Sequence, residues 1–198
     1  MTGKNCSSLT KKKTKKNYSM KKICLLIVLL TSVNLLTTAQ DRYFTKTGTI
    51  DFDGKSTFSK VHAENNSATC VLDTKTGIVQ FSMLMKGFEF PKAIMQTHFN
   101  ERYVESDKFP QSEFKGKIES SNLVNYTTDG VYDATVKGKL TIHGETKDIE
   151  ATGKIIVKGG KIFLTSVFTI QVPDYKIKAD MNDQVTITVN CILDPLTN

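Results

Sequence analysis

The residues of this chain that could do chemistry are few and far apart in the sequence. His98, His143 and Tyr175 lie in three separate segments that connect predicted strands. Side chains of these kinds could hold the polar head of a ligand or a metal ion. Two histidines without a carboxylate at metal-ligand spacing do not make a metal motif, however, and no metal site is predicted.

The acidic residues near the first of these histidines have a simpler interpretation. Glu101, Glu105 and Asp107 lie in a polar stretch, where they are expected to be solvated or to cap a helix rather than to form an acid–base pair. The sequence has no nucleophile elbow, no glycine-rich phosphate loop before a helix, and no cluster of His, Cys and carboxylate residues. We therefore expect no catalytic residues and no cofactor, and we do not expect an enzyme.

Two of the four cysteines, Cys70 and Cys191, lie within the part of the chain that is expected to fold. Both occupy apolar positions of alternating segments, which favours buried free thiols. A disulfide between them is the alternative if the protein is exported. Their spacing matches no zinc motif.

The basic character of the chain comes from its beginning. Residues 1–39 contain eight lysines and no acidic residue; subtracting these eight from 27 leaves 19 basic residues against 20 acidic ones. The remaining part is therefore close to neutral. A nucleic-acid partner would need a basic face on the folded part, so we expect no nucleic-acid binding.

Residues 20–39 have the pattern of a signal peptide. Lys21 and Lys22 precede an apolar run from Ile23 to Leu30, and small residues up to Ala39 form a cleavage site. The run is too short for a membrane span of about 20 residues, which makes a membrane anchor the less favoured alternative. Residues 1–19 are a basic leader or an artefact that precedes a true start at Met20. The mature chain, residues 40–198, is then periplasmic or secreted, with no integral membrane span after cleavage.

The mature part alternates apolar and polar residues over long segments, which predicts about eight antiparallel β-strands joined mostly by tight turns. The segments fall near residues 49–54, 68–72, 79–85, 114–120, 132–142, 149–157, 162–172 and 185–193. Long strands with one apolar face close well into a barrel. The sequence therefore predicts a mainly β protein, an eight-stranded antiparallel up-and-down barrel with a short helix over one rim. A β-sandwich is the alternative.

One stretch, residues 88–118, does not alternate. Five residues recur there at steps of three and four, the spacing of a short amphipathic helix of about three turns: Ile94, Met95, His98, Phe99 and Arg102. A helix with an apolar stripe needs an apolar surface to cover. We therefore predict a helix over one rim of the barrel, with Met95 and Phe99 pointing inward and His98 toward the mouth or the surface.

The order of the hairpins places other connections at the same rim. The turn at His143 and the loop around Tyr175 are expected beside the helix, whereas the opposite rim is expected to have only turns at Gly77, Gly130 and Gly159-Gly160. Function should lie at the rim with the longer connections.

Three segments carry a resemblance to a known family: MQTHFNERYVESDKFPQSEFKGKI, GKLTIHGETKDIEATGKI and FTIQVPDYKI. Together they resemble the YceI-like family of exported bacterial proteins, over nearly all of residues 49–193. The resemblance implies a lipocalin-like barrel that binds a long polyisoprenoid chain and implies no catalytic residue. The first third departs from the family pattern, because the chain has no Trp and His62 does not fit the usual histidine spacing.

Nine apolar residues are predicted to line the ligand site, and methionine suits such a surface because its side chain adapts to an irregular chain: Phe81, Met83, Met85, Met95, Phe99, Phe114, Leu140, Phe168 and Ile170. The residues alone are equally compatible with a filled core, which a small barrel also needs. The resemblance favours a cavity. Small inward residues also favour space inside the barrel: Gly116, Ala134, Gly138, Ala151 and Gly153.

Two functions of different classes follow. The first is an exported carrier or buffer that holds an apolar lipid, such as a polyisoprenoid or a quinone, inside the barrel. The second is a closed barrel without a ligand, which serves as a stress-protective or protein-interaction module. The sequence does not name the ligand, and it leaves open whether the protein is a monomer or a homodimer.

Overall fold

The computed structural model describes residues 41–55, 60–119, 121–178 and 183–196. The predictions for the basic leader and the signal peptide lie outside these residues. Within the described part of the chain, no helix is long and apolar enough to cross a membrane.

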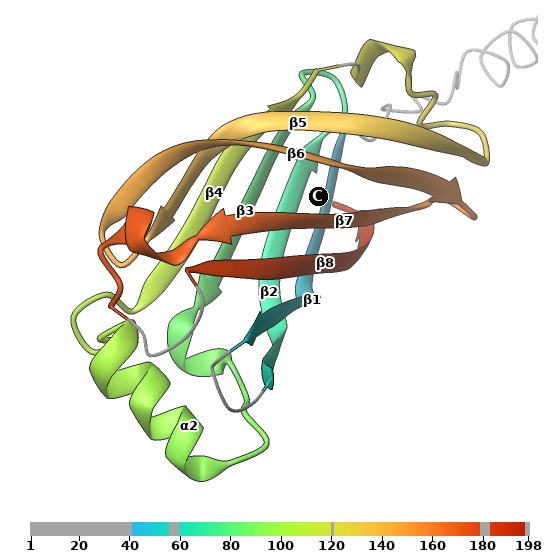
Figure 1. The fold of residues 1–198 in the computed structure, drawn as a ribbon. Helices are drawn as coiled ribbons and strands as arrows, with labels where there is room; N and C mark the ends of the chain where they lie inside the picture. Colours follow the sequence, from blue (N-terminus) through green and yellow to red (C-terminus); the bar gives the residue numbers. More distant parts are fainter. Residues whose placement is uncertain (1–40, 56–59, 120, 179–182, 197–198) are drawn as a thin grey trace, which may run out of the picture. The chain divides into compact units, whose positions relative to one another are not determined.

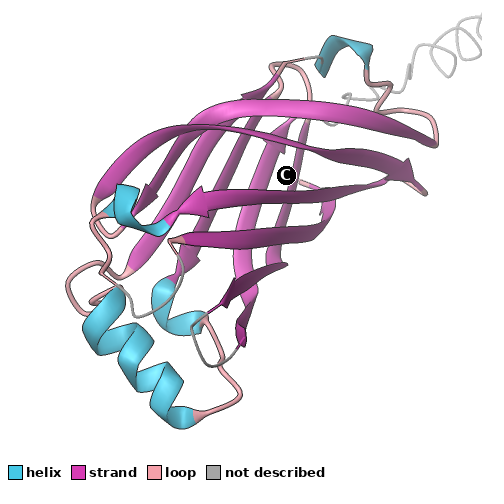
Figure 2. Ribbon diagram, viewed as in Figure 1, coloured by secondary structure: helices cyan, strands magenta, loops and turns pink. Residues whose placement is uncertain are grey.

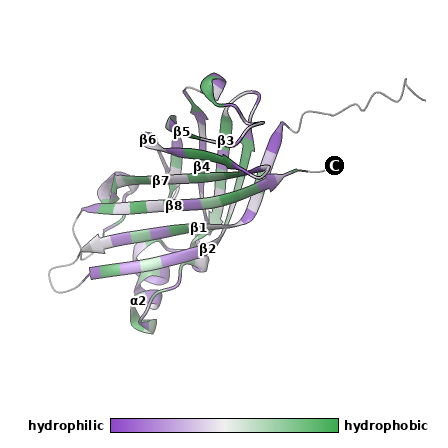
Figure 3. Ribbon diagram, turned by 90° about the vertical axis from the view of Figure 1, so that its right-hand side faces the viewer, coloured by the Kyte–Doolittle hydropathy of each residue, from purple (hydrophilic) through white to green (hydrophobic). Residues whose placement is uncertain are grey.

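Eight antiparallel strands form a closed barrel in which each strand pairs with the next and β8 pairs with β1 (Figure 1). Their bounds are β1 Arg42–Lys55, β2 Lys60–Asp73, β3 Ile78–Leu84, β4 Gln111–Ile118, β5 Gly130–Ile142, β6 Glu145–Lys158, β7 Lys161–Gln171 and β8 Gln184–Pro195. The predicted up-and-down barrel is confirmed, and the sandwich alternative is wrong because β1 and β8 close the sheet through pairs such as Ile50 with Val189. Hydrophobic and hydrophilic residues alternate along the strands (Figure 3).

The first two strands are longer than the sequence pattern indicated. The pairing of β1 with β2 shifts register between Thr45 and Gly48 and again between Gly48 and Ile50. At each shift, the alternation of inward and outward side chains along the strand is interrupted. This is why β2 buries Ala63 and Asn65, and then Ala68 after two exposed residues.

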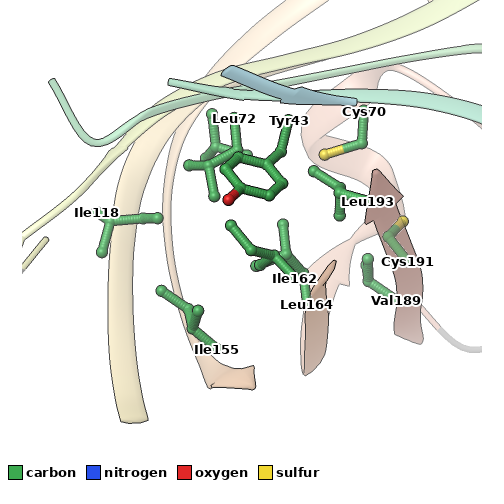
Figure 4. Packing of buried hydrophobic residues seen from close by; sticks show 11 residues of the cluster. Tyr43, Cys70, Leu72, Ile118, Ile155, Ile162, Leu164, Val189, Cys191 and Leu193 are labelled. Carbon is green, nitrogen blue, oxygen red and sulfur yellow. The ribbon is translucent and has the colours of Figure 1, made fainter. Parts of the chain in front are cut away.

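The end of the barrel opposite the helix is filled with side chains (Figure 4). Leu72, Ile162 and Leu193 are fully buried there, and Tyr43 packs among them. The expectation of tight turns alone at this end is wrong, because the connection from β4 to β5 contains a short 3₁₀ turn, Ser121–Leu123. Val124 and Tyr126 from this connection pack against the filled core, and burial raises the pKa of Tyr126 to about 12.

Cys70 and Cys191 are free thiols in the same core, as the alternation predicted. They lie on β2 and β8, the two neighbours of β1, and they are hydrogen-bonded to each other. Gly48 of β1 leaves room for them, because a Cβ there would lie 2.5 Å from Sγ of Cys191. Burial raises the pKa of the Cys70 thiol, which keeps it protonated.

The predicted helix lies between β3 and β4 at the other end of the barrel (Figure 2). It begins as the α-helix α2, Ala93–His98, and continues as a π-helical turn, Phe99–Tyr103. Phe99 is buried and Met95 is half-buried, but Ile94 is 58% exposed. The predicted apolar stripe was therefore one residue too wide, because a helix of this length buries only a narrow face.

Two further short turns lie at the helix end. A 3₁₀ turn at Met85–Gly87 follows β3, and another, η4, spans Val172–Tyr175 after β7. The predicted set of connections at this rim is thus confirmed: the helix, the β5–β6 turn at His143 and the loop at Tyr175.

The backbone pairing of the closed barrel is partial between β6 and β7. The pairing of β6 with β7 runs from Lys158 with Lys161 to Gly153 with Ser166 and stops there. Both strands continue to the helix end, paired with β5 and β8 respectively. Figure 1 shows β6 and β7 close together at their hairpin and apart toward η4. We call the gap between residues 145–152 of β6 and 167–171 of β7 the slot.

A substitution at Gly138 tests how closely β4 and β5 pack in the barrel wall. This glycine pairs with Gly116, and a Cβ on Gly138 would lie 2.5 Å from Cα of Gly116 and 2.7 Å from Cζ of the Phe114 ring. We expect Gly138→Ala to lower the free energy of unfolding by about 2 kcal/mol, measured by urea denaturation, because backbone and ring must move apart.

The control on the same strand is Val131→Ala, whose side chain is 64% exposed. It should change the free energy of unfolding by less than about 0.5 kcal/mol. Equal losses in the two variants would contradict the close approach at Gly138.

Candidate functional site

An apolar cavity of about 340 Å³ lies inside the barrel toward the helix end. Its volume is at the low end of the range of roughly 300–1,000 Å³ that is usual for small-molecule sites. All nine residues predicted to line a ligand site border this cavity: Phe81, Met83, Met85, Met95, Phe99, Phe114, Leu140, Phe168 and Ile170. That they bind a ligand remains a prediction.

The cavity exists because small residues face inward in the middle of the barrel. Ala134, Ala151 and Gly153 border it directly. The glycine pair Gly116 and Gly138 acts differently, since the ring of Phe114 lies over both of them and occupies the space that side chains there would fill. The inward alanines and Gly153 thus leave open space, whereas Gly116 and Gly138 leave space that the ring of Phe114 fills.

The helix closes the cavity with an aromatic cluster. The ring of Phe99 lies against the rings of Phe52, Phe88 and Phe90, with centroids 6.2, 5.5 and 4.9 Å apart. Such contacts add to the burial of apolar area and fix the rings relative to one another. Phe88 and Phe90 were not among the predicted site residues, because they lie in the stretch that does not alternate. Phe52 was also not among them, although it alternates with Ile50 in the first strand.

A buried asparagine fixes the start of this cover. Asn65 is fully buried; its side-chain amide donates to the carbonyl oxygen of Leu84 at 3.0 Å, and its Oδ1 accepts from the backbone and hydroxyl of Ser67. A buried polar group with all these partners holds one geometry. It therefore determines where β3 ends and the helical connection leaves the barrel.

Polar groups at the cavity are few. His98 borders it from the helix, and its ring packs edge-on against Tyr103. Ser112 is buried and donates to the carbonyl oxygen of Thr141 at 2.9 Å. Burial raises the pKa of Tyr175 to about 12, so its hydroxyl stays neutral at physiological pH. An apolar wall with few polar groups selects a ligand by shape and apolar area.

The predicted group of His98, His143 and Tyr175 is brought together only in part. Nδ1 of His143 lies 3.1 Å from the carbonyl oxygen of Tyr175, and Nε2 of the same ring lies 2.9 Å from a carboxylate oxygen of Glu105. The expectation that this histidine lacks a carboxylate partner is therefore wrong, because the fold brings Glu105 to it across 38 residues of sequence. His98 lies apart from this group at the cavity wall.

A second cluster lies on the outer face of β1 and β2. Ligand atoms of Asp51, His62 and Glu64 lie within 4.8 Å of one another, and Oδ1 of Asp53 accepts a hydrogen bond from His62 Nδ1 at 2.9 Å. Burial and the charge of Glu64 raise the pKa of Asp51. These side chains are partly exposed, and their spacing in the sequence matches no metal-binding motif. We assign the cluster no function.

The family now follows from comparison with known proteins. The profile of the YceI-like domain matches residues 34–193. The chain belongs to the YceI-like family. A search of curated proteins found no match.

Solved structures share the fold of this YceI-like protein at low sequence identity. A polyisoprenoid-binding domain from Saccharophagus degradans is 12% identical with a TM-score of 0.68, and the alignment covers 78% of this chain and 98% of that one. BcnA of Burkholderia cenocepacia is 15% identical with a TM-score of 0.60, covering 74% and 95%. The YceI protein of Campylobacter jejuni is 19% identical with a TM-score of 0.50, covering 64% and 78%. At these identities the likeness shows the fold.

Phe99 offers a test of the helical cover. We expect Phe99→Ala to lower the free energy of unfolding by about 3 kcal/mol, because it removes a buried ring from an aromatic cluster and leaves a void. Thermal and urea denaturation followed by circular dichroism measure it.

Ile94→Ala is the matched control on the same helix, since Ile94 is 58% exposed. Its effect should stay below about 0.5 kcal/mol. A large loss at Ile94, with little at Phe99, would mean that the helix covers the barrel with its other face.

Proposed function

We propose that this YceI-like protein binds an apolar lipid, with the apolar chain inside the barrel cavity. The observation that carries the proposal is the cavity itself: the barrel is filled with side chains at one end but hollow and apolar at the other. The related domain from Saccharophagus degradans is described as polyisoprenoid-binding, which supports the same class of ligand here.

The energetics favour a ligand of this class. Each buried methylene-sized group contributes about 0.8 kcal/mol, so a short stretch of chain suffices for micromolar affinity without a polar contact. The filled core behind the cavity limits the depth to which a chain can enter. We therefore propose that one end of a polyisoprenoid or quinone tail occupies the cavity, and that the polar end stays at the rim with the longer connections.

A carrier or buffer outside the cytoplasm fits this mode of binding and the signal-peptide pattern of residues 20–39. Such a protein sequesters its ligand and releases it unchanged, and we propose that it has no catalytic step. The alternative function, a ligand-free interaction module, would need the interior to be filled along its whole length, and the cavity argues against it.

Ala134 gives a direct test of binding in the cavity. It faces the interior and borders the cavity, so Ala134→Leu places three extra carbons in that space. With the fluorescent probe N-phenyl-1-naphthylamine, we expect saturable binding by the natural chain. The variant should bind at least about tenfold more weakly, the equivalent of about 1.4 kcal/mol.

The matched control is Thr135→Leu, the next residue on the same strand, which faces away from the interior. It should bind the probe as the natural chain does, and circular dichroism confirms that both variants are folded. Equal affinity of the two variants would place the probe outside the barrel and overturn the proposal.

A further inference from the structure

Three connections at the helix end meet at one imidazole ring. His143, in the β5–β6 turn, has a side chain only 11% exposed. Its Nε2 contacts Glu105 of the connection after the helix, and its Nδ1 contacts the carbonyl of Tyr175 in η4. The ring of Phe109 packs edge-on against the imidazole, with centroids 4.4 Å apart. The ring thus ties the helix connection, the β5–β6 turn and η4 together.

Both partners of the imidazole are hydrogen-bond acceptors. The carbonyl of Tyr175 has no proton to give, so Nδ1 must carry one and donate it. A neutral imidazole would then present a bare Nε2 to the carboxylate of Glu105. Two hydrogen bonds therefore require that the ring be charged, with Glu105 ionised. The hydrogen bond from His143, aided by Lys108, lowers the pKa of Glu105, in agreement with an ionised carboxylate.

The backbone points to the same three connections. Among the described residues, the non-glycine residues with positive φ are Glu105, His143 and Lys176, at 45°, 52° and 55°. Such conformations are unfavourable for side chains other than glycine and persist only where surrounding contacts hold them. Each of the three connections that meet at the imidazole therefore contains one strained residue, and loss of these contacts would let the connections relax.

The η4 turn covers the slot between β6 and β7. Its Val172 and Tyr175 are buried and pack with Ile170 of β7 and with Ile149 of β6, on opposite sides of the slot. Where the β6–β7 pairing stops, the cavity is bordered by Thr152 and by the last paired residues Lys154 and Thr165. The hydroxyl of Ser166 donates to the carbonyl oxygen of Thr152 at this point, and η4 covers the unpaired strands beyond it.

We propose that η4 is a gate over the slot and that the contacts from Glu105 through His143 to Tyr175 form its latch. A neutral imidazole can donate to only one of these two acceptors, and the ionised carboxylate of Glu105 is the stronger one. Loss of one proton from the ring therefore removes the hydrogen bond to Tyr175 and opens the latch. An apolar chain then enters and leaves the cavity sideways between β6 and β7. This inference rests on the proposed function, because a gate needs a ligand to admit.

Other charged groups surround the latch and must be counted in its pH dependence: Lys108 of the helix connection, Glu145 and Lys147 at the start of β6, and Asp174 and Lys176 of the η4 segment. Lys176 Nζ lies 2.7 Å from Glu145 Oε1 and lowers the pKa of that carboxyl, so this second tie does not break in the range where histidine titrates. The latch is therefore closed while the imidazole carries both protons and weakened once it has lost one.

Glu105→Gln tests the proton requirement. A glutamine amide can donate to the bare Nε2 of a neutral ring, so this variant should stay latched without the proton. Release of N-phenyl-1-naphthylamine is followed by stopped-flow fluorescence at about pH 5.5 and about pH 8.5, on either side of the usual histidine pKa. We expect release from the natural chain to be roughly fivefold faster or more at the higher pH, and release from Glu105→Gln to be slow at both.

Asp107→Asn is the matched control. It removes the same negative charge only two residues from Glu105, and the Asp107 side chain is 90% exposed. It should keep the pH dependence of the natural chain. Tyr175→Ala keeps the carbonyl but removes the ring over the slot, and it should speed release at both pH values. A pH-independent natural chain, an unchanged dependence in Glu105→Gln, or unchanged release in Tyr175→Ala would each overturn the gate.

A second measurement separates this proposal from the proposed function. Long-range ¹⁵N–¹H NMR spectra report the charge of each imidazole, and His143→Gln assigns the signal. We expect a charged His143 ring at about pH 5.5 in the natural chain, with or without the probe. A neutral ring there contradicts the latch even if the probe binds, whereas failure to bind the probe with a charged ring contradicts the proposed function alone.

Discussion

Closing eight strands into one ring forces every inward side chain to share a single enclosed space. A barrel of this size is just wide enough to be filled by its own side chains or to hold one small ligand. In this chain both solutions occur, one at each end. Large residues from the ends of β2, β7 and β8 fill the space opposite the helix, while alanine and glycine in the middle of β5 and β6 leave it open toward the helix. The helical connection must then cover an apolar opening, and the structure of that rim follows from this need.

The parts of the molecule with a regular alternation of apolar and polar residues could be predicted from the sequence. Strands β3 to β8 alternate regularly enough to be located from residue types, and the nine apolar residues that were predicted to line a site all border the cavity. The beginning of the barrel was harder to predict. Shifts of register near Thr45 and Gly48 break the alternation shortly before the cavity residue Phe52. The cavity residues Phe88 and Phe90 lie in the connection between β3 and β4, which does not alternate.

Contacts between distant connections could not be read from sequence spacing. Glu105 and His143 are 38 residues apart, and only the barrel topology brings them together. The missing β6–β7 pairs are also invisible in the sequence, because Ile149 and Ala151 of β6 and Phe168 and Ile170 of β7 alternate with polar residues although these parts of the strands are not paired with each other. Pairing of this kind depends on strand curvature rather than on residue type. Solved structures that share this fold at 12–19% identity show that the barrel tolerates wide changes in sequence.

The central claim is that the cavity holds an apolar chain. Native mass spectrometry of the protein, purified without detergent from cells that naturally make it, tests this most directly. We expect a bound compound at about one per chain, which organic extraction removes and which proves to be a polyisoprenoid, a quinone or a similar apolar lipid. Protein that carries only its own mass, with no apolar compound in the extract, would contradict the account.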